Sequence, residues 1–405
     1  MNKRVVVTGL GIISSIGIGK DVFWNSLMNG RSGISEISLF DTSRFNRRYA
    51  GEIKDFLPEI FIPHKFITFL GRASQFTIAS VKLALEDAFL SLREIKEKKV
   101  AVVIGVTIPE GDSIDFSSEM ILKGQFEEIE SKILLNIFAP AVARNVGNFF
   151  KIKDTNLLIP CACAAGNYAI GHAFDLIKKS EVDLAIAGGS EALSRIAFQG
   201  FQRLNAMSID KCSPFDRDRK GMILGEGCGI LIIESLERAL ERNAPIYAEV
   251  LGYGLSCDAH HITIPEKRGV IKAMRKALDS SGVIAEDIDY ISAHGTGTPA
   301  NDKTEAAAIK ELFSSRCKKI PVSSIKSMLG HCMGAATAIE AITCCLALKE
   351  QKIPPTINFC NPDPECDIDC VPNKARNAEL NVVLNNGFAF GGNNCCVVFS
   401  CMNKA

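Results

Sequence analysis

The sequence has no excess of charge, because 46 lysines and arginines balance 46 aspartates and glutamates. This balance argues against a broad basic field for nucleic acid, so any charged partner must meet a local patch. Glycine, lysine or aspartate interrupts every apolar run before the ~18 residues that a membrane helix requires. We therefore expect a protein that binds neither nucleic acid nor a membrane.

Histidine is scarce, with six residues, whereas cysteine is abundant, with fifteen. The cysteines have no regular spacing, and several, such as Cys395-Cys396, stand in apolar stretches. This pattern favours a reducing compartment over a disulfide framework, so we predict a cytoplasmic protein. Cys360, Cys366 and Cys370 fit no common zinc spacing and lack a fourth ligand, so no metal site is predicted.

The N-terminus resembles two kinds of functional segment and matches neither. The apolar run from Val5 imitates a signal peptide, but glycines and serines interrupt it and no small-residue cleavage site follows. Gly9 and Gly11 suggest a dinucleotide-binding loop, but Ser14 occupies the place of its third glycine. We predict a first core strand and no nucleotide cofactor.

The chain, 405 residues long and 47% hydrophobic, can form two to three domain-sized units or one large domain with internal symmetry. Residues 1–245 and 246–405 carry a similar succession of patterns, with residues 109–150 as an inserted helical segment of the first half. A strand, a turn and a helix of small residues occur at 157–178 and again at 322–348. We predict an α/β fold of two pseudo-repeated halves whose small-residue helices pack together between sheets.

The first small-residue segment contains a candidate nucleophile, Cys163. Residues 157–159 predict a short strand that ends before Pro160, and a closely packed helix is expected from Ala164. Cys163 would then lie in the first helical turn, where unpaired N–H groups and the helix dipole lower the pKa of a thiol. Taken alone, the stretch fits a buried structural cysteine equally well.

Three glycine-containing segments of the second half follow strands, where α/β folds place catalytic residues. They are Ala293-His-Gly-Thr-Gly-Thr298, Ile325-Lys-Ser-Met-Leu-Gly-His331 and Gly387-Phe-Ala-Phe-Gly-Gly-Asn-Asn394. Each could be an ordinary turn. However, two of the six histidines, His294 and His331, stand in them. Together with Cys163 they indicate nucleophilic catalysis assisted by two histidines.

These motifs resemble those of the β-ketoacyl-acyl carrier protein synthases, specifically the elongating type II kind. The resemblance rests on Cys163 in Ala-Cys-Ala-Ala-Gly, on His294, and on Lys326 with His331, and it covers the whole chain. It implies a thiolase-like fold, a layered α/β/α/β/α sandwich. It also implies a decarboxylative Claisen condensation of an acyl-Cys163 thioester with malonyl-acyl carrier protein, which gives β-ketoacyl-acyl carrier protein.

The resemblance also implies roles for individual residues. Backbone N–H groups of Cys163 and Phe390 would form an oxyanion hole, and His294 and His331, as neutral donors, would stabilise an enolate. Lys326 and Glu340 would organise His331 and the charge around it. The implied substrate contacts are Thr296, Thr298, Ile108, Phe388 and Gly391.

Thr296 and Thr298 would hold the pantetheine arm, and Phe390 would act as a gate with backbone freedom from its glycine neighbours. Ile108 would lie where the acyl tunnel meets a dimer interface. No cofactor of the enzyme is implied, because 4'-phosphopantetheine arrives on the carrier protein.

The pathway and the partner subunit stay open. Ser213 and Asn393 depart from residues common in fatty-acid enzymes, and the Phe388–Asn394 motif looks more like synthases of specialised metabolism. The alternatives are fatty-acid elongation by a homodimer and a type II polyketide or polyene synthase paired with a chain-length-factor-like subunit. A non-catalytic dimer partner would lack the nucleophile, which this chain keeps.

Carrier proteins are acidic across the family, so a local basic patch is expected on this neutral chain. The candidates are Lys65, Arg72, Lys211 and Arg217.

Overall fold

The computed structural model describes residues 3–402, in which eleven strands form one mixed sheet. The sheet consists of two five-stranded halves joined where β1 pairs with β9 over only three residue pairs, with the short β2 (Gly17–Ile18) beside β1. The strands of the first half, in spatial order, are β1 (Val5–Ser14), β8 (Gly227–Ser235), β7 (Leu184–Glu191), β5 (Val100–Gly105) and β6 (Thr155–Ile159). Those of the second are β9 (Ala248–Cys257), β15 (Asn393–Ser400), β14 (Val382–Phe388), β10 (Tyr290–Ser292) and β11 (Val322–Ser323).

The two halves repeat one topology. In the first, β1–β8 and β8–β7 are antiparallel, and β7–β5 and β5–β6 are parallel. In the second, β9–β15 and β15–β14 are antiparallel, and β14–β10 and β10–β11 are parallel. The predicted pseudo-repeat is therefore confirmed strand by strand, and the predicted boundary at residue 245 falls just before β9.

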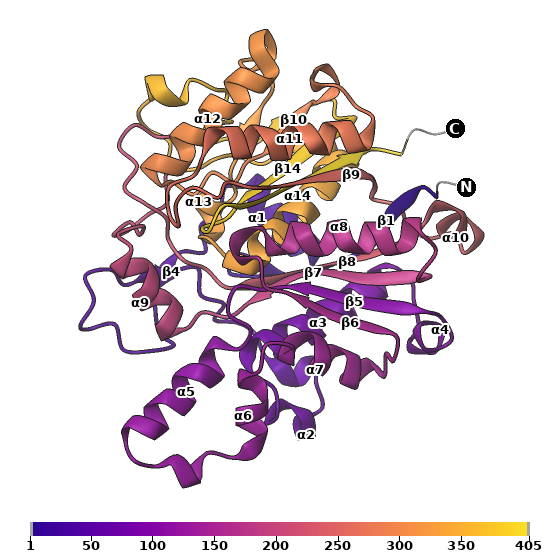
Figure 1. Cartoon of the computed structure of the whole chain (residues 1–405), viewed down its shortest axis with the longest axis vertical. Helices are drawn as coiled ribbons and strands as arrows, with labels where there is room; N and C mark the ends of the chain where they lie inside the picture. Colours follow the sequence, from indigo (N-terminus) through magenta and orange to yellow (C-terminus); the bar gives the residue numbers. More distant parts are fainter. Residues whose placement is uncertain (1–2, 403–405) are drawn as a thin grey trace.

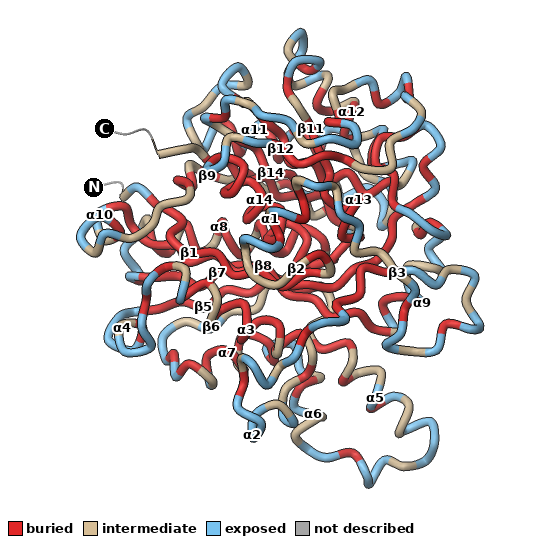
Figure 2. Tube along the Cα trace, turned by 180° about the vertical axis from the view of Figure 1, so that it is seen from behind, coloured by how far each residue is buried: buried red, intermediate tan, exposed pale blue. Residues whose placement is uncertain are grey.

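Two central helices, α8 (Ala165–Lys178) and α14 (Ala336–Glu350), lie between the sheet halves (Figure 1). Small residues allow the close approach: a Cβ on Gly166 would lie 2.6 Å from the backbone nitrogen of Ala338. Most residues of both helices are buried (Figure 2). The outer layers contain α3 (Arg72–Asp87) and α7 (Ala141–Phe150) on one side, and α11 (Lys267–Ser281) and α12 (Pro299–Phe313) on the other. The predicted α/β/α/β/α sandwich is confirmed.

Four strands of the first half, β1, β5, β7 and β8, are buried on both faces, which explains their largely apolar sequences. In β5, Val103 faces the central core, whereas Val102 and Ile104 face the outer core beneath α3 and α7. This alternation follows from the two-residue period of a strand. The sheet thus separates two hydrophobic cores.

The predicted inserted segment contains α5 (Gly111–Leu122), α6 (Ser131–Ile137) and α7, and α5 and α6 project from the body in Figure 1. Within residues 3–402, no single helix is long and apolar enough to cross a membrane; α6 and α7 would qualify only together, with a bend of 117°.

The remaining helices and strands are α1 (Lys20–Met28), β3 (Ser35–Glu36), β4 (Tyr49–Ala50), α2 (His64–Ile67), α4 (Leu92–Lys96), α9 (Arg195–Arg203), α10 (Leu236–Glu241), α13 (Lys326–Leu329), β12 (Lys352–Ile353) and β13 (Arg376–Asn377).

Candidate active site

Cys163 lies in a tight turn between β6 and α8. The turn is a 3-10 helix, Ala162–Ala164, and Ala162 enters it with a φ of 46°. The second half repeats this geometry at Met333–Ala335, where Met333 has a φ of 45° and α14 follows. Cys163 therefore lies in the 3-10 turn directly before α8 and not in the first turn of α8 as predicted, and its counterpart in the repeat is Gly334.

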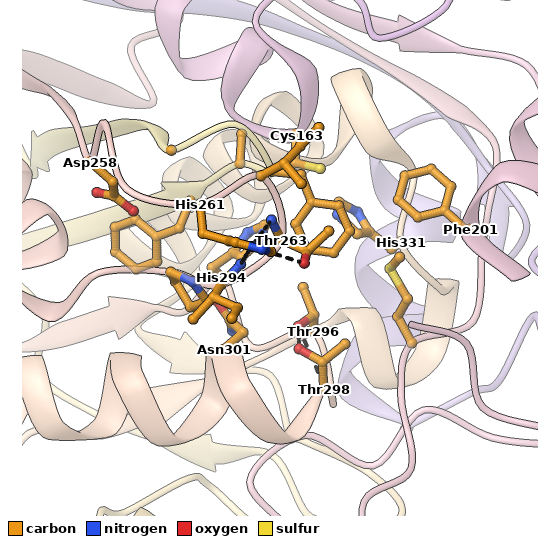
Figure 3. A pocket seen from close by; sticks show the side chains of 18 residues that line it. Cys163, Phe201, Asp258, His261, Thr263, His294, Thr296, Thr298, Asn301 and His331 are labelled. Atoms are coloured by element: carbon orange, nitrogen blue, oxygen red, sulfur yellow. Dashed lines mark hydrogen bonds between the residues drawn. The ribbon is translucent and has the colours of Figure 1, made fainter. Parts of the chain in front are cut away.

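The two predicted histidines reach the same pocket as Cys163 (Figure 3). The ring centroids of His294 and His331 are 5.4 Å apart, with the rings nearly perpendicular at 83°. Both rings are buried. The structure thus brings Cys163 together with two histidines that both lie more than 100 positions further along the sequence.

His294 is held by a carboxylate that sequence analysis missed. Glu305 of α12 accepts hydrogen bonds from the backbone N–H groups of His294 (2.9 Å) and Gly295 (2.8 Å), and Asn386 also donates to it (3.1 Å). Burial raises the pKa of Glu305, and these donors oppose that rise. Gly295 and Gly297 adopt positive φ angles of 36° and 76°, which explains the glycines of this turn.

His331 is oriented by the turn that follows it. Its Nδ1 accepts a hydrogen bond from the backbone N–H of Met333 (3.2 Å), so Nε2 carries the proton of the neutral ring. Burial lowers the pKa of both His294 and His331 well below the ordinary value of 6.5, and the charge of Lys326 lowers each further. Both rings are therefore neutral near pH 7, as predicted.

Lys326 and Glu340 form an ion pair that is almost fully buried. Burial raises the pKa of Glu340 to about 7, and the ammonium of Lys326 opposes the rise. The charge of Lys326 also acts on the pKa of Cys163 and of both histidines. The pair is therefore part of the electrostatic surroundings of the pocket although neither residue lines it.

The predicted lowering of the Cys163 pKa is wrong for the free site. Burial raises the pKa to about 11, because removal from water disfavours the thiolate more than nearby groups favour it. Those groups are Lys326 and the backbone N–H groups of Phe390 and of Cys163 itself. The two N–H groups are the pair predicted to form an oxyanion hole.

A second unpredicted carboxylate, Glu191 at the end of β7, ties together two turns beside Cys163. It accepts hydrogen bonds from the backbone N–H groups of Thr107 (2.7 Å), Ile108 (2.8 Å) and Gly334 (2.9 Å). Burial raises its pKa to about 7. The only signal in the sequence was a glutamate directly after a buried strand, which does not reveal its three remote donors.

The predicted substrate contacts divide into two groups. Thr296, Thr298 and Phe388 line the pocket, and the hydroxyl oxygens of the two threonines are 2.8 Å apart. Ile108 lies in a neighbouring apolar cluster that also contains Phe390. Gly391, with a φ of 86°, donates its N–H to the carbonyl of residue 262 (2.8 Å) in the facing loop. Substrate contact by all five residues stays a prediction.

Arg72, a predicted candidate for contact with a carrier protein, already has a partner within the chain that compensates its charge. Its guanidinium makes two hydrogen bonds to the buried carboxylate of Glu226 (2.6 and 2.9 Å) and one to the carbonyl of Ile53 (2.7 Å). Lys65, Lys211 and Arg217 are exposed. Across the described part of the chain, no three His, Cys, Asp or Glu side chains are grouped to hold a metal ion.

A layered fold with a buried cysteine and two neutral histidines in one pocket fits an acyl-transferring enzyme of the thiolase-like type. Family models described as "Beta-ketoacyl synthase, N-terminal domain" and "Beta-ketoacyl synthase, C-terminal domain" match residues 2–239 and 247–360. The chain belongs to the beta-ketoacyl synthase family.

The relatives fall into two groups. Curated relatives named 3-oxoacyl-[acyl-carrier-protein] synthase 2 include those of Synechocystis sp., 41% identical, and Coxiella burnetii, 39% identical, each with 98% of both chains covered. Similar solved structures include the ishigamide ketosynthase/chain length factor, with a TM-score of 0.96, 43% identity and full coverage of both chains. Another is a type II PKS acyl-carrier protein in complex with its ketosynthase bound to the hexaketide, with a TM-score of 0.90, 30% identity and full coverage of both chains.

Proposed function

We propose that this chain is a 3-oxoacyl-acyl carrier protein synthase that lengthens an acyl chain by decarboxylative Claisen condensation. The observation that carries the proposal is the convergence of Cys163 and two neutral histidines in one pocket. A hydrolase would need one base and an activated water, and has no use for a second buried neutral histidine.

The first step is acyl transfer to Cys163. The sulfur attacks the carbonyl carbon of the acyl thioester, and the carbonyl oxygen becomes an oxyanion at the N–H groups of Cys163 and Phe390. Collapse of this intermediate breaks the bond to the pantetheine sulfur. The proton of the Cys163 thiol ends on that departing sulfur, so a raised resting pKa does not prevent the transfer.

The second step is decarboxylation of the malonyl thioester. Cleavage of the bond to the carboxylate releases carbon dioxide and leaves its electron pair on an enolate oxygen. A ring N–H of His294 and Nε2–H of His331 donate to that oxygen; as neutral donors they stabilise the charge without first binding a proton. The enolate carbon then attacks the acyl-Cys163 carbonyl, and expulsion of the thiolate gives the β-ketoacyl thioester.

The substrate carrier is an acyl carrier protein, whose 4'-phosphopantetheine arm Thr296 and Thr298 would hold, and the enzyme needs no cofactor of its own. The curated relatives favour fatty-acid elongation, whereas the ishigamide and hexaketide structures favour a type II polyketide or polyene synthase. Both pathways use the same condensation, so the proposal covers either. The cysteine pattern supports a cytoplasmic location.

A dimer is also proposed, either of two identical chains or with a chain-length-factor-like subunit. β6 is the last strand of the sheet, and its Leu157, Leu158 and Ile159 are half-exposed. An apolar edge strand left open invites pairing with another chain. Phe116, Phe126 and other apolar residues of the projecting α5–α6 segment are exposed as well.

Intact-protein mass spectrometry tests the acyl-transfer step. The wild type and Cys163→Ala would each be mixed with acyl-carrier proteins of several chain lengths. We expect one acyl group on the wild type and none on Cys163→Ala. In contrast, His294→Ala should still be acylated but should release no carbon dioxide from malonyl-carrier protein. Equal acylation of wild type and Cys163→Ala would refute the nucleophile.

A further inference from the structure

Glu191 is a buried carboxylate to which the proposed reaction steps assign no role. It is the last residue of β7, and it is completely removed from solvent. Burial raises its pKa, and the groups that oppose this rise are hydrogen-bond donors of Thr107, Ile108 and Gly334. The carboxylate is therefore held by donors from two turns that lie far apart in the sequence.

The two turns that Glu191 binds are in direct contact, one after β5 and the other before α14. A Cβ on Gly334 would lie 2.4 Å from the carbonyl carbon of Val106 and 2.5 Å from the backbone nitrogen of Thr107. Oε2 of Glu191 accepts hydrogen bonds from the N–H groups of both Thr107 and Gly334, and Oε1 accepts from Ile108. The carboxylate thus fixes the position of one turn relative to the other.

The turn before α14 supports the ring of His331, which lines the pocket (Figure 3). The backbone of His331 has other partners, because its N–H donates to the carbonyl of Ile223 (2.6 Å) and its carbonyl accepts from Gly225 (3.0 Å). The ring Nδ1 instead accepts from the N–H of Met333 (3.2 Å), the residue before Gly334. Displacement of this turn would remove the hydrogen bond that keeps the proton of the neutral ring on Nε2.

We propose that Glu191 is a positioning residue for the condensation step. Its hydrogen bond to Gly334 holds the neighbouring N–H of Met333 in place, and that N–H fixes the tautomer and orientation of the His331 ring. The inference rests on the proposed function, in which Nε2–H of His331 donates to the enolate oxygen. Acyl transfer to Cys163 uses backbone N–H groups instead, so it should depend less on Glu191. A role in folding alone would affect both steps alike.

Two variants separate the reach of the Glu191 side chain from its charge. In Glu191→Gln, the amide oxygen can take the place of Oε2 and accept from Thr107 and Gly334, although the charge and the hydrogen bond to Ile108 are lost. In Glu191→Asp, the charge remains, but the side chain is shorter by one methylene group and cannot reach both turns. We therefore expect Glu191→Asp to be the more damaging change although it keeps the charge.

The two steps are measured separately, as acylation of Cys163 by acyl-carrier protein and as condensation of preformed acyl-enzyme with malonyl-carrier protein. In Glu191→Asp, the rate of condensation at saturating malonyl-carrier protein should fall by about tenfold or more, because a small displacement of a catalytic group is costly. The rate of acylation and the KM for malonyl-carrier protein should stay within about threefold of the wild type. In Glu191→Gln, both rates should stay within about threefold of the wild type.

The matched control is Glu234→Gln. Glu234 is also a fully buried carboxylate, but it lies opposite Leu184 at the other end of β7, about 23 Å from Glu191 at a rise of about 3.3 Å per residue. We expect this control to lower the free energy of unfolding and to leave the ratio of condensation to acylation unchanged.

Equal losses of condensation and acylation in Glu191→Asp would overturn the positioning role. Slower condensation in Glu191→Gln than in Glu191→Asp would also overturn it, because charge and not reach would then matter. Failure of acyl-carrier protein to acylate Cys163 in the wild type would instead overturn the proposed function.

Discussion

The side chains of Asn167 and Asn385 are hydrogen-bonded to each other in the middle of the molecule, with 2.8 Å between Asn385 Nδ2 and Asn167 Oδ1. The backbone N–H of Asn167 donates to the hydroxyl of Thr337 (2.9 Å), and Asn385 Nδ2 also donates to the Thr337 carbonyl (2.9 Å). All three side chains are fully buried. They connect the helix that follows Cys163, the helix of Glu340 and the strand that leads to Phe390.

Because the two buried amides are bonded to each other, losing both should cost less than the sum of losing each alone. We expect Asn167→Leu or Asn385→Leu to lower the free energy of unfolding by about 1–3 kcal/mol, since each leaves a buried polar group unsatisfied. The double variant should lose less than the sum of the single losses. Denaturant titration of the four proteins measures this coupling. Strictly additive losses would show that the two amides do not act as a unit.

Lys326 and Glu340 should show a similar coupling. Glu340→Leu leaves a buried ammonium uncompensated, so we expect a loss of about 3–5 kcal/mol in the free energy of unfolding. Lys326→Met/Glu340→Leu should recover much of that stability but should remain slow in condensation, because the positive charge beside the pocket is gone. Condensation at the wild-type rate in the double variant would show that the charge of Lys326 does not assist the reaction.

The two histidines should make stability depend on pH in a defined direction. Their pKa values in the folded state lie well below 6.5. Below pH 6.5 the unfolded state therefore binds protons at these histidines, whereas the folded state does not. Their contribution is thus present above pH 6.5 and is lost as the pH falls, with a limiting slope of about 1.4 kcal/mol per pH unit for each histidine.

The raised pKa values of Glu191 and Glu340 make the free energy of unfolding depend on pH in the opposite direction. Their folded pKa values, about 7, are raised, so their contribution is present below their unfolded pKa and is lost as the pH rises through 7. Denaturant titrations from pH 5 to 8 would therefore measure the free energy of unfolding of the wild type and of His294→Asn/His331→Asn. The difference between the two proteins at each pH gives the contribution of the histidines. Identical slopes for the two proteins would contradict the depressed histidine pKa values.

Alkylation of Cys163 reports on its raised pKa. With a pKa of about 11, the rate of reaction with iodoacetamide should keep rising from pH 7 to 9.5 without a plateau. Mass spectrometry of the peptide with Cys163 separates this thiol from the others, and Lys326→Met should react more slowly still. A plateau near neutral pH would show a stabilised thiolate in the resting enzyme.

Much of the fold, and the candidate catalytic group of Cys163, His294 and His331, was predictable from the sequence. The small-residue helices at 165–178 and 336–350 and the glycine turns at His294 and His331 are local patterns, and strand ends place such turns at one edge of a sheet. The carboxylates Glu191 and Glu305 were not predictable, because each works through backbone N–H groups of remote turns. The same holds for Cys163: burial of its thiol is a tertiary property, and it outweighs the local effect of the helix.

The most direct test of the account is a single turnover of preformed acyl-Cys163 enzyme with malonyl-carrier protein. Carbon dioxide and β-ketoacyl-carrier protein would be quantified together, and the mass of the enzyme would be followed. We predict one carbon dioxide and one β-ketoacyl-carrier protein for each acyl group lost from Cys163. Release of the acyl group as a free acid, or carbon dioxide without β-ketoacyl product, would contradict the account.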